Sequence, residues 1–272
     1  MVGRERSYLK GLIMLTQDQR QSLDVPVIKR PLWLHLDDNA PRTKSGFSAF
    51  YNKEKKKILG IVPDGAQYLS HLEAIDTIEL ILKELDESTE TSLHLLKGGT
   101  LLYAHFKIKK EMDITPDETE EAFILSPEII LHNGFDGFTG AGMEFGISIN
   151  DMHCRIQSLP QREMAAFYPI SNVKSHIQAF LGGGMDKICN HIISLQDIDQ
   201  WNTDEVVDFC KKILSNKDLK DIYEVVNASS RNWNIFIFLL EKIEKKRGYR
   251  AKREAEIALS KIFKLKWSMS YR

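Results

Sequence analysis

The spacing of the apolar residues changes twice along the chain, and this restricts the fold more than any other feature. Between residues 67 and 86 they recur every three or four positions, as on one face of a helix: Leu69, Leu72, Ile75, Ile78, Ile81, Leu82 and Leu85. From residue 92 to 150 the period falls to two, and from residue 171 it is helical again. Strands and helices are therefore segregated along the chain, which predicts an α+β fold.

Extended segments separated by turn signals follow the 67–86 helix. They comprise residues 92–97, 100–109, 121–132 and 142–150, with 152–159 as a further candidate. Gly98 and Gly99 suit the positive φ angles of a tight hairpin turn. In segment 142–150, apolar residues alternate with small or polar ones, so the two faces of this strand differ. The pattern predicts an antiparallel β-meander packed on the long helix.

Three regions are expected along the chain. Residues 1–46 form an N-terminal arm, residues 47–170 an α+β core, and residues 171–272 a mostly helical region with a basic tail. The core opens with a hairpin of FSAFY (47–51) and KILGIV (57–62). Ser70 and Glu73 have the spacing of a capping box at the start of the long helix.

The composition, 43% hydrophobic and 28% charged, is that of an ordinary globular protein. No apolar run is long enough to cross a membrane, and the first twenty residues lack a cleavage signal. The three cysteines are far apart, without a C-x-x-C pair, as in a reducing compartment. We therefore expect a cytoplasmic protein with no membrane association and no cofactor.

A zinc site is the alternative use of two of these cysteines. The pairs His153/Cys154 and Cys189/His191 could supply four ligands if the fold joined them. C-x-H is not a usual ligand spacing, so an incidental occurrence is the preferred interpretation, and no metal is expected.

The formal net charge of −1 conceals an uneven distribution. Residues 241–272 contain eleven Lys or Arg against four Glu, whereas residues 111–121 contain six acidic residues and no basic one. A basic tail suits a polyanion, but a near-neutral chain argues against coating duplex DNA by charge alone.

Two basic groups are candidates for nucleic-acid binding. One combines the aromatic residues Phe47, Phe50 and Tyr51 with the hairpin lysines Lys53, Lys55, Lys56 and Lys57. The other comprises Lys245, Lys246, Arg247, Arg250, Lys252 and Arg253. Cations beside aromatic rings are typical of proteins that bind single-stranded nucleic acid, because the cations contact the phosphates and the rings stack on the bases. The hypothesis requires both groups to share one surface. The alternatives are a solvated turn and aromatic core residues.

A catalytic site has less support. Glu128 and Asp136 could act as paired carboxylates with His132 or His153 as a base, but no nucleophile has a recognisable partner. Asn133 and Asp136 could equally close a turn through local backbone bonds. The glycines of FLGGGMDK (180–187) lack the phosphate-loop spacing, so a helix break is predicted there.

Several motifs in order carry a family resemblance. KILGIV, KGGTLLYAHFKI, PEIILHNGFDG and DMHCRIQ resemble the phage/plasmid-like proteins with domain of unknown function 932. Asn133, Asp136 and Gly137 match the family's Asn-x-x-Asp-Gly turn, and Cys154 stands at the family cysteine. The family arginine precedes that cysteine, whereas Arg155 follows it here. The resemblance covers roughly residues 30–265 and includes Asn227-Ala228.

The resemblance implies a mobile-element setting. The order of the elements is also similar to that of phage single-strand annealing proteins. The leading hypothesis is a non-enzymatic nucleic-acid-binding accessory protein of a phage, prophage or plasmid, with single-strand DNA annealing or recombination as its role. The alternative is an anti-defence or regulatory protein that binds a host protein or a small nucleotide. Assembly into a homo-oligomer remains open.

Overall fold

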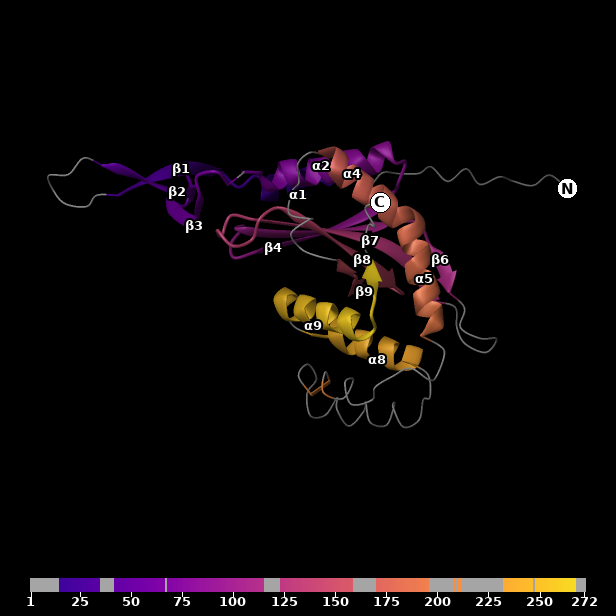
Figure 1. The fold of residues 1–272 in the computed structure, drawn as a ribbon. Coiled ribbons are helices and arrows are strands. Elements are labelled where there is room, and N and C mark those ends of the chain that lie inside the picture. Colours follow the sequence, from indigo (N-terminus) through magenta and orange to yellow (C-terminus); the bar gives the residue numbers. More distant parts are fainter. Residues whose placement is uncertain are drawn as a thin grey trace.

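The computed structural model describes residues 15–34, 42–66, 68–114, 123–158, 170–195, 208, 210–211, 232–246 and 248–267. Its helices are α1 (Gln17–Leu23), α2 (His71–Glu84), α4 (Ile170–Ala179), α5 (Met185–Ser194), α8 (Asn232–Glu244) and α9 (Tyr249–Ile262). They pack around the larger of the two antiparallel β-sheets in these ranges (Figure 1). The prediction of an α+β protein with antiparallel sheets is confirmed.

The smaller sheet has the order β1–β2–β3, formed by Val27–Leu34, Thr43–Asn52 and Lys57–Pro63. Figure 1 shows these strands extending to one side of the larger sheet. The predicted hairpin of residues 47–62 is present as β2 and β3. The structure differs from the expected arm at 1–46, because β1 lies within that region and pairs with β2. The boundary between residues 46 and 47 therefore falls inside a strand.

The larger sheet has the order β4–β5–β7–β8–β9. Its strands are Thr89–Leu96, Leu101–Ile108, Phe123–Gly134, Gly142–Ile149 and Met152–Arg155, and β6 (Met112–Ile114) pairs with β7. Gly98 and Gly99 have φ angles of +68° and +88°, so they form the predicted turn between β4 and β5. A short parallel pair, β10 (Gln157–Ser158) with β11 (Lys266–Trp267), links the end of α9 to this region.

One face of the larger sheet is apolar and belongs to the main core. Residues of α2 such as Ile75 and Ile78 are fully buried in the same core as Leu102 and Phe106 of β5. α2 begins at the predicted capping box, in which Ser70 and Glu73 exchange hydrogen bonds. Figure 1 shows α1, α2 and α4 together on this side of the sheet.

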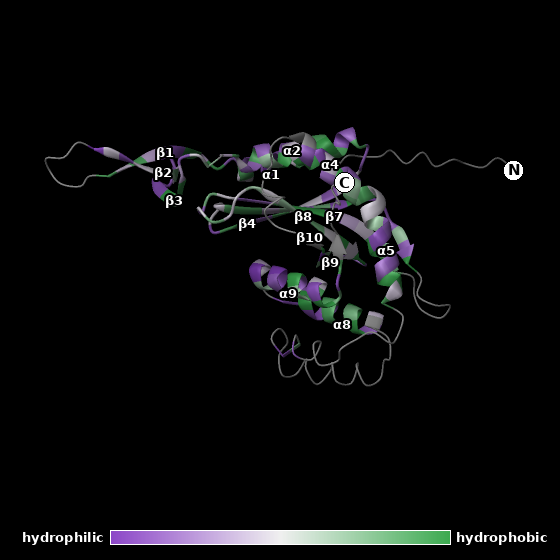
Figure 2. Cartoon of the chain, viewed as in Figure 1, coloured by the Kyte–Doolittle hydropathy of each residue, from purple (hydrophilic) through white to green (hydrophobic). Residues whose placement is uncertain are grey.

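The other face of the larger sheet is polar and contacts α9. Tyr249 lies 4.5 Å from Tyr103 of β5, measured between ring centroids. Figure 2 shows purple, hydrophilic residues along α9 and a greener α8 beside it. The alternation predicted for residues 142–150 thus separates an apolar core from a polar layer.

The two sheets meet at the turn that follows β7. Phe135 is 1% exposed and packs with Val27, Phe50 and Val62 in a second, smaller core. A Cβ on Gly60 would lie 2.3 Å from the backbone carbon of Asp136. The turn can therefore approach β3 only because residue 60 has no side chain.

The triple glycine interrupts a helix, as predicted. A π-helical turn, η1 (Phe180–Gly184), separates α4 from α5, and Gly182 has non-helical angles of φ −87° and ψ −123°. No strand precedes this glycine segment in the way that a phosphate loop requires, because α4 leads directly into it.

Candidate nucleic-acid interface

The smaller sheet carries one of the two basic groups considered from the sequence. Residues 27–63 contain eight Lys or Arg against three Asp or Glu, a net charge of +5 in a chain of formal net charge −1. We call strands β1–β3, together with the turn that connects β2 to β3, the basic sheet. This excess of positive charge favours association with a polyanion.

One face of the basic sheet points away from Phe135 and carries exposed rings and apolar groups. The strand register aligns Arg30, Ala49 and Ile61 in one row and Ile28, Tyr51 and Ile58 in the next. Phe47, Ile58 and Ile61 remain about half exposed, at 48%, 50% and 54%. Of the aromatic residues considered from the sequence, Phe50 belongs to the core, whereas Phe47 and Tyr51 lie on this outer face.

Two cation–π pairs lie on the same sheet. The guanidinium carbon of Arg30 is 5.6 Å from the ring centroid of Tyr51, and the Lys44 ammonium is 5.8 Å from that of Trp33. Trp33 and Lys44 are cross-strand partners where β1 and β2 run on past β3, and Trp33 is 52% exposed. The sequence hypothesis missed Arg30, Trp33 and Lys44. The register places Arg30 near Tyr51, whereas Trp33 and Lys44 pair at the opposite end of β2 from the lysine turn.

The predicted lysine turn connects β2 to β3. Lys53, Lys55, Lys56 and Lys57 are all exposed. The Lys55 ammonium donates to the Gly98 carbonyl at 3.0 Å, which ties the turn to the larger sheet. Within the part of the chain that the structure describes, the other three lysines form no ion pair.

Three of the six residues of the C-terminal basic group pair with glutamates. Arg250 pairs with Glu254 at 2.9 Å, Lys252 with Glu244, and Arg253 with Glu144. Lys245 is exposed, Lys246 is partly exposed, and Arg247 lies outside the described residues. Figure 1 shows α9 beneath the larger sheet, away from the projecting end of the basic sheet. Among the described residues, the basic sheet therefore offers more unpaired cations to a polyanion than the C-terminal basic group does.

Asp136 forms the local turn that its sequence context suggested. Its carboxylate accepts the backbone N–H groups of Phe138 and Thr139 at 3.0 and 2.7 Å, and the Lys97 ammonium at 3.0 Å. These donors, with Thr139 and Lys97 foremost, outweigh burial and lower the pKa of Asp136. Asp136 thus has local partners, as an Asx turn requires.

Asn133 and Gly137 have longer-range roles. Asn133 is buried in β7, and its amide donates to the Leu69 carbonyl at 2.9 Å and to Nδ1 of His71 at 3.1 Å. Gly137 has a φ of +81°, and a Cβ there would lie 2.5 Å from the Ile61 carbonyl oxygen. The turn of the family motif therefore joins α2, the larger sheet and the basic sheet.

No family model, curated protein or solved structure matches this chain. The resemblance to the phage/plasmid-like family remains a prediction from its motifs. None of the helices in the described ranges has both the length and the apolar character needed to cross a bilayer.

Cys154 and Arg155 point to opposite faces of β9. Cys154 is fully buried in the main core, and burial raises the pKa of its thiol well above the ordinary value. Arg155 lies in the polar layer, where it pairs with Glu144 and Glu256 and donates to the Tyr249 hydroxyl at 2.6 Å. Burial raises the pKa of Glu256 to about 7, although Arg155 opposes this.

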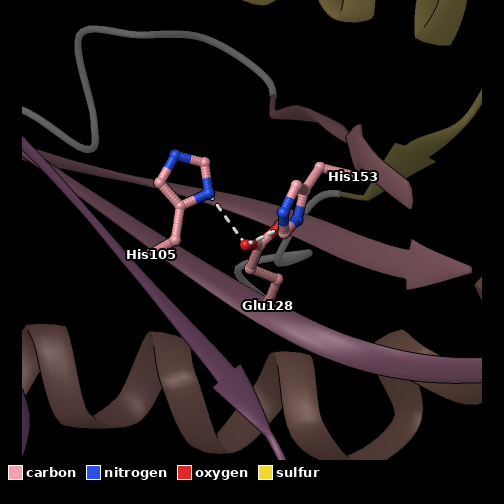
Figure 3. A group of neighbouring side chains, drawn as sticks. All are labelled: His105, Glu128 and His153. Atoms are coloured by element: carbon pink, nitrogen blue, oxygen red, sulfur yellow. Dashed lines mark hydrogen bonds and ion pairs between the residues drawn. The ribbon is translucent and has the colours of Figure 1, made fainter. Parts of the chain in front are cut away.

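His105, Glu128 and His153 meet in the same polar layer (Figure 3). Nδ1 of His105 lies 2.8 Å from Glu128 Oε1, and Nδ1 of His153 lies 3.1 Å from Oε2. Burial acts to raise the pKa of Glu128, but these two hydrogen bonds hold the pKa well below its ordinary value. The sequence hypothesis named Glu128 and His153 but missed His105, which lies diagonally opposite Glu128 on the neighbouring strand.

The other catalytic and zinc groupings suggested by the sequence do not form in the described residues. His132 bonds to the Gly140 carbonyl at 3.1 Å, and Asp136 bonds within its turn. Cys189 lies 3.7 Å from the Met112 sulfur, and His191 bonds to the Phe263 carbonyl at 2.7 Å. His153/Cys154 and Cys189/His191 therefore do not form one ligand set.

Proposed function

We propose that this chain is a non-enzymatic nucleic-acid-binding protein of a phage, prophage or plasmid, and that the basic sheet binds single strands. The observation that carries the proposal is the outer face of that sheet. It combines the half-exposed ring of Phe47 with the Arg30–Tyr51 pair, and the adjoining turn carries lysines that form no ion pair with any described residue, Lys53, Lys56 and Lys57. In this proposal the protein acts in the cytoplasm, and the antiparallel meander packed on α2 forms the base that holds the basic sheet.

The chemistry of single strands fits this face. Phosphates attract lysines whatever the base sequence of the strand, and unpaired bases stack on exposed aromatic rings. Arg30 beside Tyr51 and Lys44 beside Trp33 each supply a cation and a ring within 6 Å. Annealing of complementary strands is the specific role that we assign to this binding.

A salt titration tests the phosphate contacts. Labelled oligo-dT is titrated with the full chain at several salt concentrations, with fluorescence anisotropy as the readout. The variant Lys53→Ser/Lys56→Ser/Lys57→Ser should bind more weakly and with a salt dependence shallower by about 2, since each single-strand phosphate contact contributes about 0.7 to the slope. Lys55 is left intact because it bonds to Gly98.

A matched control removes the same charge elsewhere. Lys83→Ser/Lys187→Ser/Lys261→Ser changes three exposed helix lysines and should leave the slope unchanged. Equal effects of the two triple variants would show that only net charge matters. Absence of binding by the wild-type chain at low salt would contradict the proposed function itself.

The role of the rings is tested separately. Tyr51→Ala should weaken binding to oligo-dT by about 1–3 kcal/mol, the range for one base–ring stack. An abasic strand of equal length offers phosphates without bases and should bind the wild type and Tyr51→Ala equally. A loss on both strands would point to damage of the sheet instead of lost stacking.

Annealing is measured directly. Two complementary labelled strands are mixed with the chain, and duplex formation is followed by energy transfer. The wild type should accelerate annealing, and the triple lysine variant of the turn should not. Strand binding without acceleration would retain the binding proposal and remove the annealing role.

A further inference from the structure

We propose that His105, Glu128 and His153 form a binding site for a divalent transition-metal ion of the zinc class. One potential ligand atom from each residue lies within 4.8 Å of the other two (Figure 3). Two imidazole nitrogens and one carboxylate oxygen form a donor set that zinc and its neighbours bind well. This inference is independent of the proposed nucleic-acid binding.

The sheet holds the three side chains without help from flexible loops. His105 is on β5, Glu128 on β7 and His153 on β9, all on the polar face. β8 runs between β7 and β9, and it has Gly146 directly opposite Glu128. A Cβ on Gly146 would lie 3.2 Å from Glu128 Oε2. Glycine at this position therefore leaves room for the carboxylate to reach toward β9.

The surrounding groups resemble the outer shell of a metal site. Nε2 of His105 lies 2.6 Å from the Tyr249 hydroxyl, which also accepts from Arg155 at 2.6 Å. With Nδ1 bound to an ion, Nε2 carries the proton and donates to Tyr249, which orients the ring. Without an ion, Nδ1–H donates to Glu128 and the Tyr249 hydroxyl donates to Nε2. The tyrosine hydroxyl satisfies both states.

The charged groups of the polar layer favour the binding of a cation. Glu128, Glu144 and Glu256 provide three carboxylates, against the guanidinium groups of Arg155 and Arg253. With neutral histidines and all three carboxylates ionised, the group has an excess of one negative charge. Buried excess charge is costly, and a dication that carries one hydroxide would cancel it.

The site has a route to solvent on one side. The side chain of His153 is 28% exposed, whereas those of His105 and Glu128 are 6% and 0% exposed. Three protein ligands leave a tetrahedral ion one position for water, as in catalytic zinc sites. The buried hydroxyl of Ser148, the cross-strand partner of His153, has no hydrogen-bond partner among the described residues. It is available to a water at that position.

Metal titration of the full chain tests the proposal. Chelator-treated protein is titrated with Co²⁺, followed by its visible d–d absorption, and then with Zn²⁺ in competition. One ion per chain should bind, with a spectrum of nitrogen and oxygen ligands. His153→Gln should lower the affinity at least tenfold, and Tyr249→Phe by about 10- to 100-fold, the range for loss of an outer-shell partner.

A control variant addresses the competing zinc ligands. His191→Gln alters the histidine beside Cys189, outside the proposed site, and should leave the affinity unchanged. Three results would overturn the proposal: no ion bound by the wild type, equal affinities of the wild type and Tyr249→Phe, or thiolate charge-transfer bands in the Co²⁺ spectrum. Tyr249→Phe retains the ring and the ligands, so it keeps the test decisive if His153→Gln does not fold.

Discussion

Asn133 donates a hydrogen bond from its side-chain amide to Nδ1 of His71, across 3.1 Å, and so joins β7 to the first turn of α2. Nε2 of the same histidine lies 3.0 Å from the Gly99 carbonyl and donates to it. Both ring nitrogens are therefore used by a neutral imidazole, and protonation of Nδ1 would place two donors against each other. Burial lowers the pKa of His71 to about 4.

This histidine gives the first prediction, on pH. Between its ordinary pKa of 6.5 and its folded value of about 4, the unfolded chain binds more protons than the folded one. The His71 contribution is thus complete above pH 6.5 and is lost as the pH falls to 4, by about 3 kcal/mol in the free energy of unfolding.

Urea unfolding of the wild type and His71→Gln from pH 7.5 to 4 measures this loss. The wild type should lose about 3 kcal/mol more than the variant over that range, because glutamine does not titrate. Parallel curves for the two proteins would mean that His71 has an ordinary pKa in the folded state.

The second prediction concerns the contact between the two sheets. Gly137→Ala should reduce the free energy of unfolding by about 2–5 kcal/mol, since it adds left-handed strain of about 1–2 kcal/mol and a clash with Ile61 of about 1–3 kcal/mol. Gly46→Ala is the matched control, because Gly46 has a φ of +78° and nothing within 4 Å of an added Cβ. Equal losses in the two variants would exclude the clash.

The third prediction separates two arginines of α9. Arg253→Gln removes a partner of Glu144, whose side chain is only 14% exposed, and should destabilise the fold by about 1–3 kcal/mol. Arg250→Gln removes a pair of exposed residues on one helix, worth about 0.3–0.5 kcal/mol. Thermal unfolding of both variants checks this order. A larger effect at Arg250 would mean that the buried pair of Arg253 with Glu144 does not stabilise the fold as proposed.

The fourth prediction concerns thiol reactivity. Burial raises the pKa of all three cysteines; Cys154 is fully buried, whereas Cys189 is only half-buried. Because the thiolate is the reactive form, a disulfide reagent should label Cys189 first and Cys154 only after unfolding. Mass spectrometry of timed samples identifies the labelled residue, and Cys189→Ser should remove the fast phase. Rapid labelling of Cys154 would show that β9 opens in the native state.

Several elements of the fold were predictable because their causes are local. The capping box of Ser70 and Glu73 and the turn at Gly98 and Gly99 each depend on residues within four positions. The lysine turn and the Asx turn of Asp136 are local in the same way. β1 was not predicted for two reasons. Its partner β2 follows a connection rich in turn-forming residues, and Pro31 interrupts the strand pattern within β1.

The sequence by itself determined the long helix, most strands of the larger sheet and which face of β8 is apolar, since periodicity acts through neighbouring residues. Only the tertiary structure decided the partners of the charged side chains. Arg253 meets Glu144 across 109 positions, and His105, Glu128 and His153 meet through the register of four strands. A shift of one residue would turn these side chains to the other face of the sheet. Strand register depends on the packing of the whole core, and it therefore determines both which cations remain unpaired and which side chains form the buried cluster.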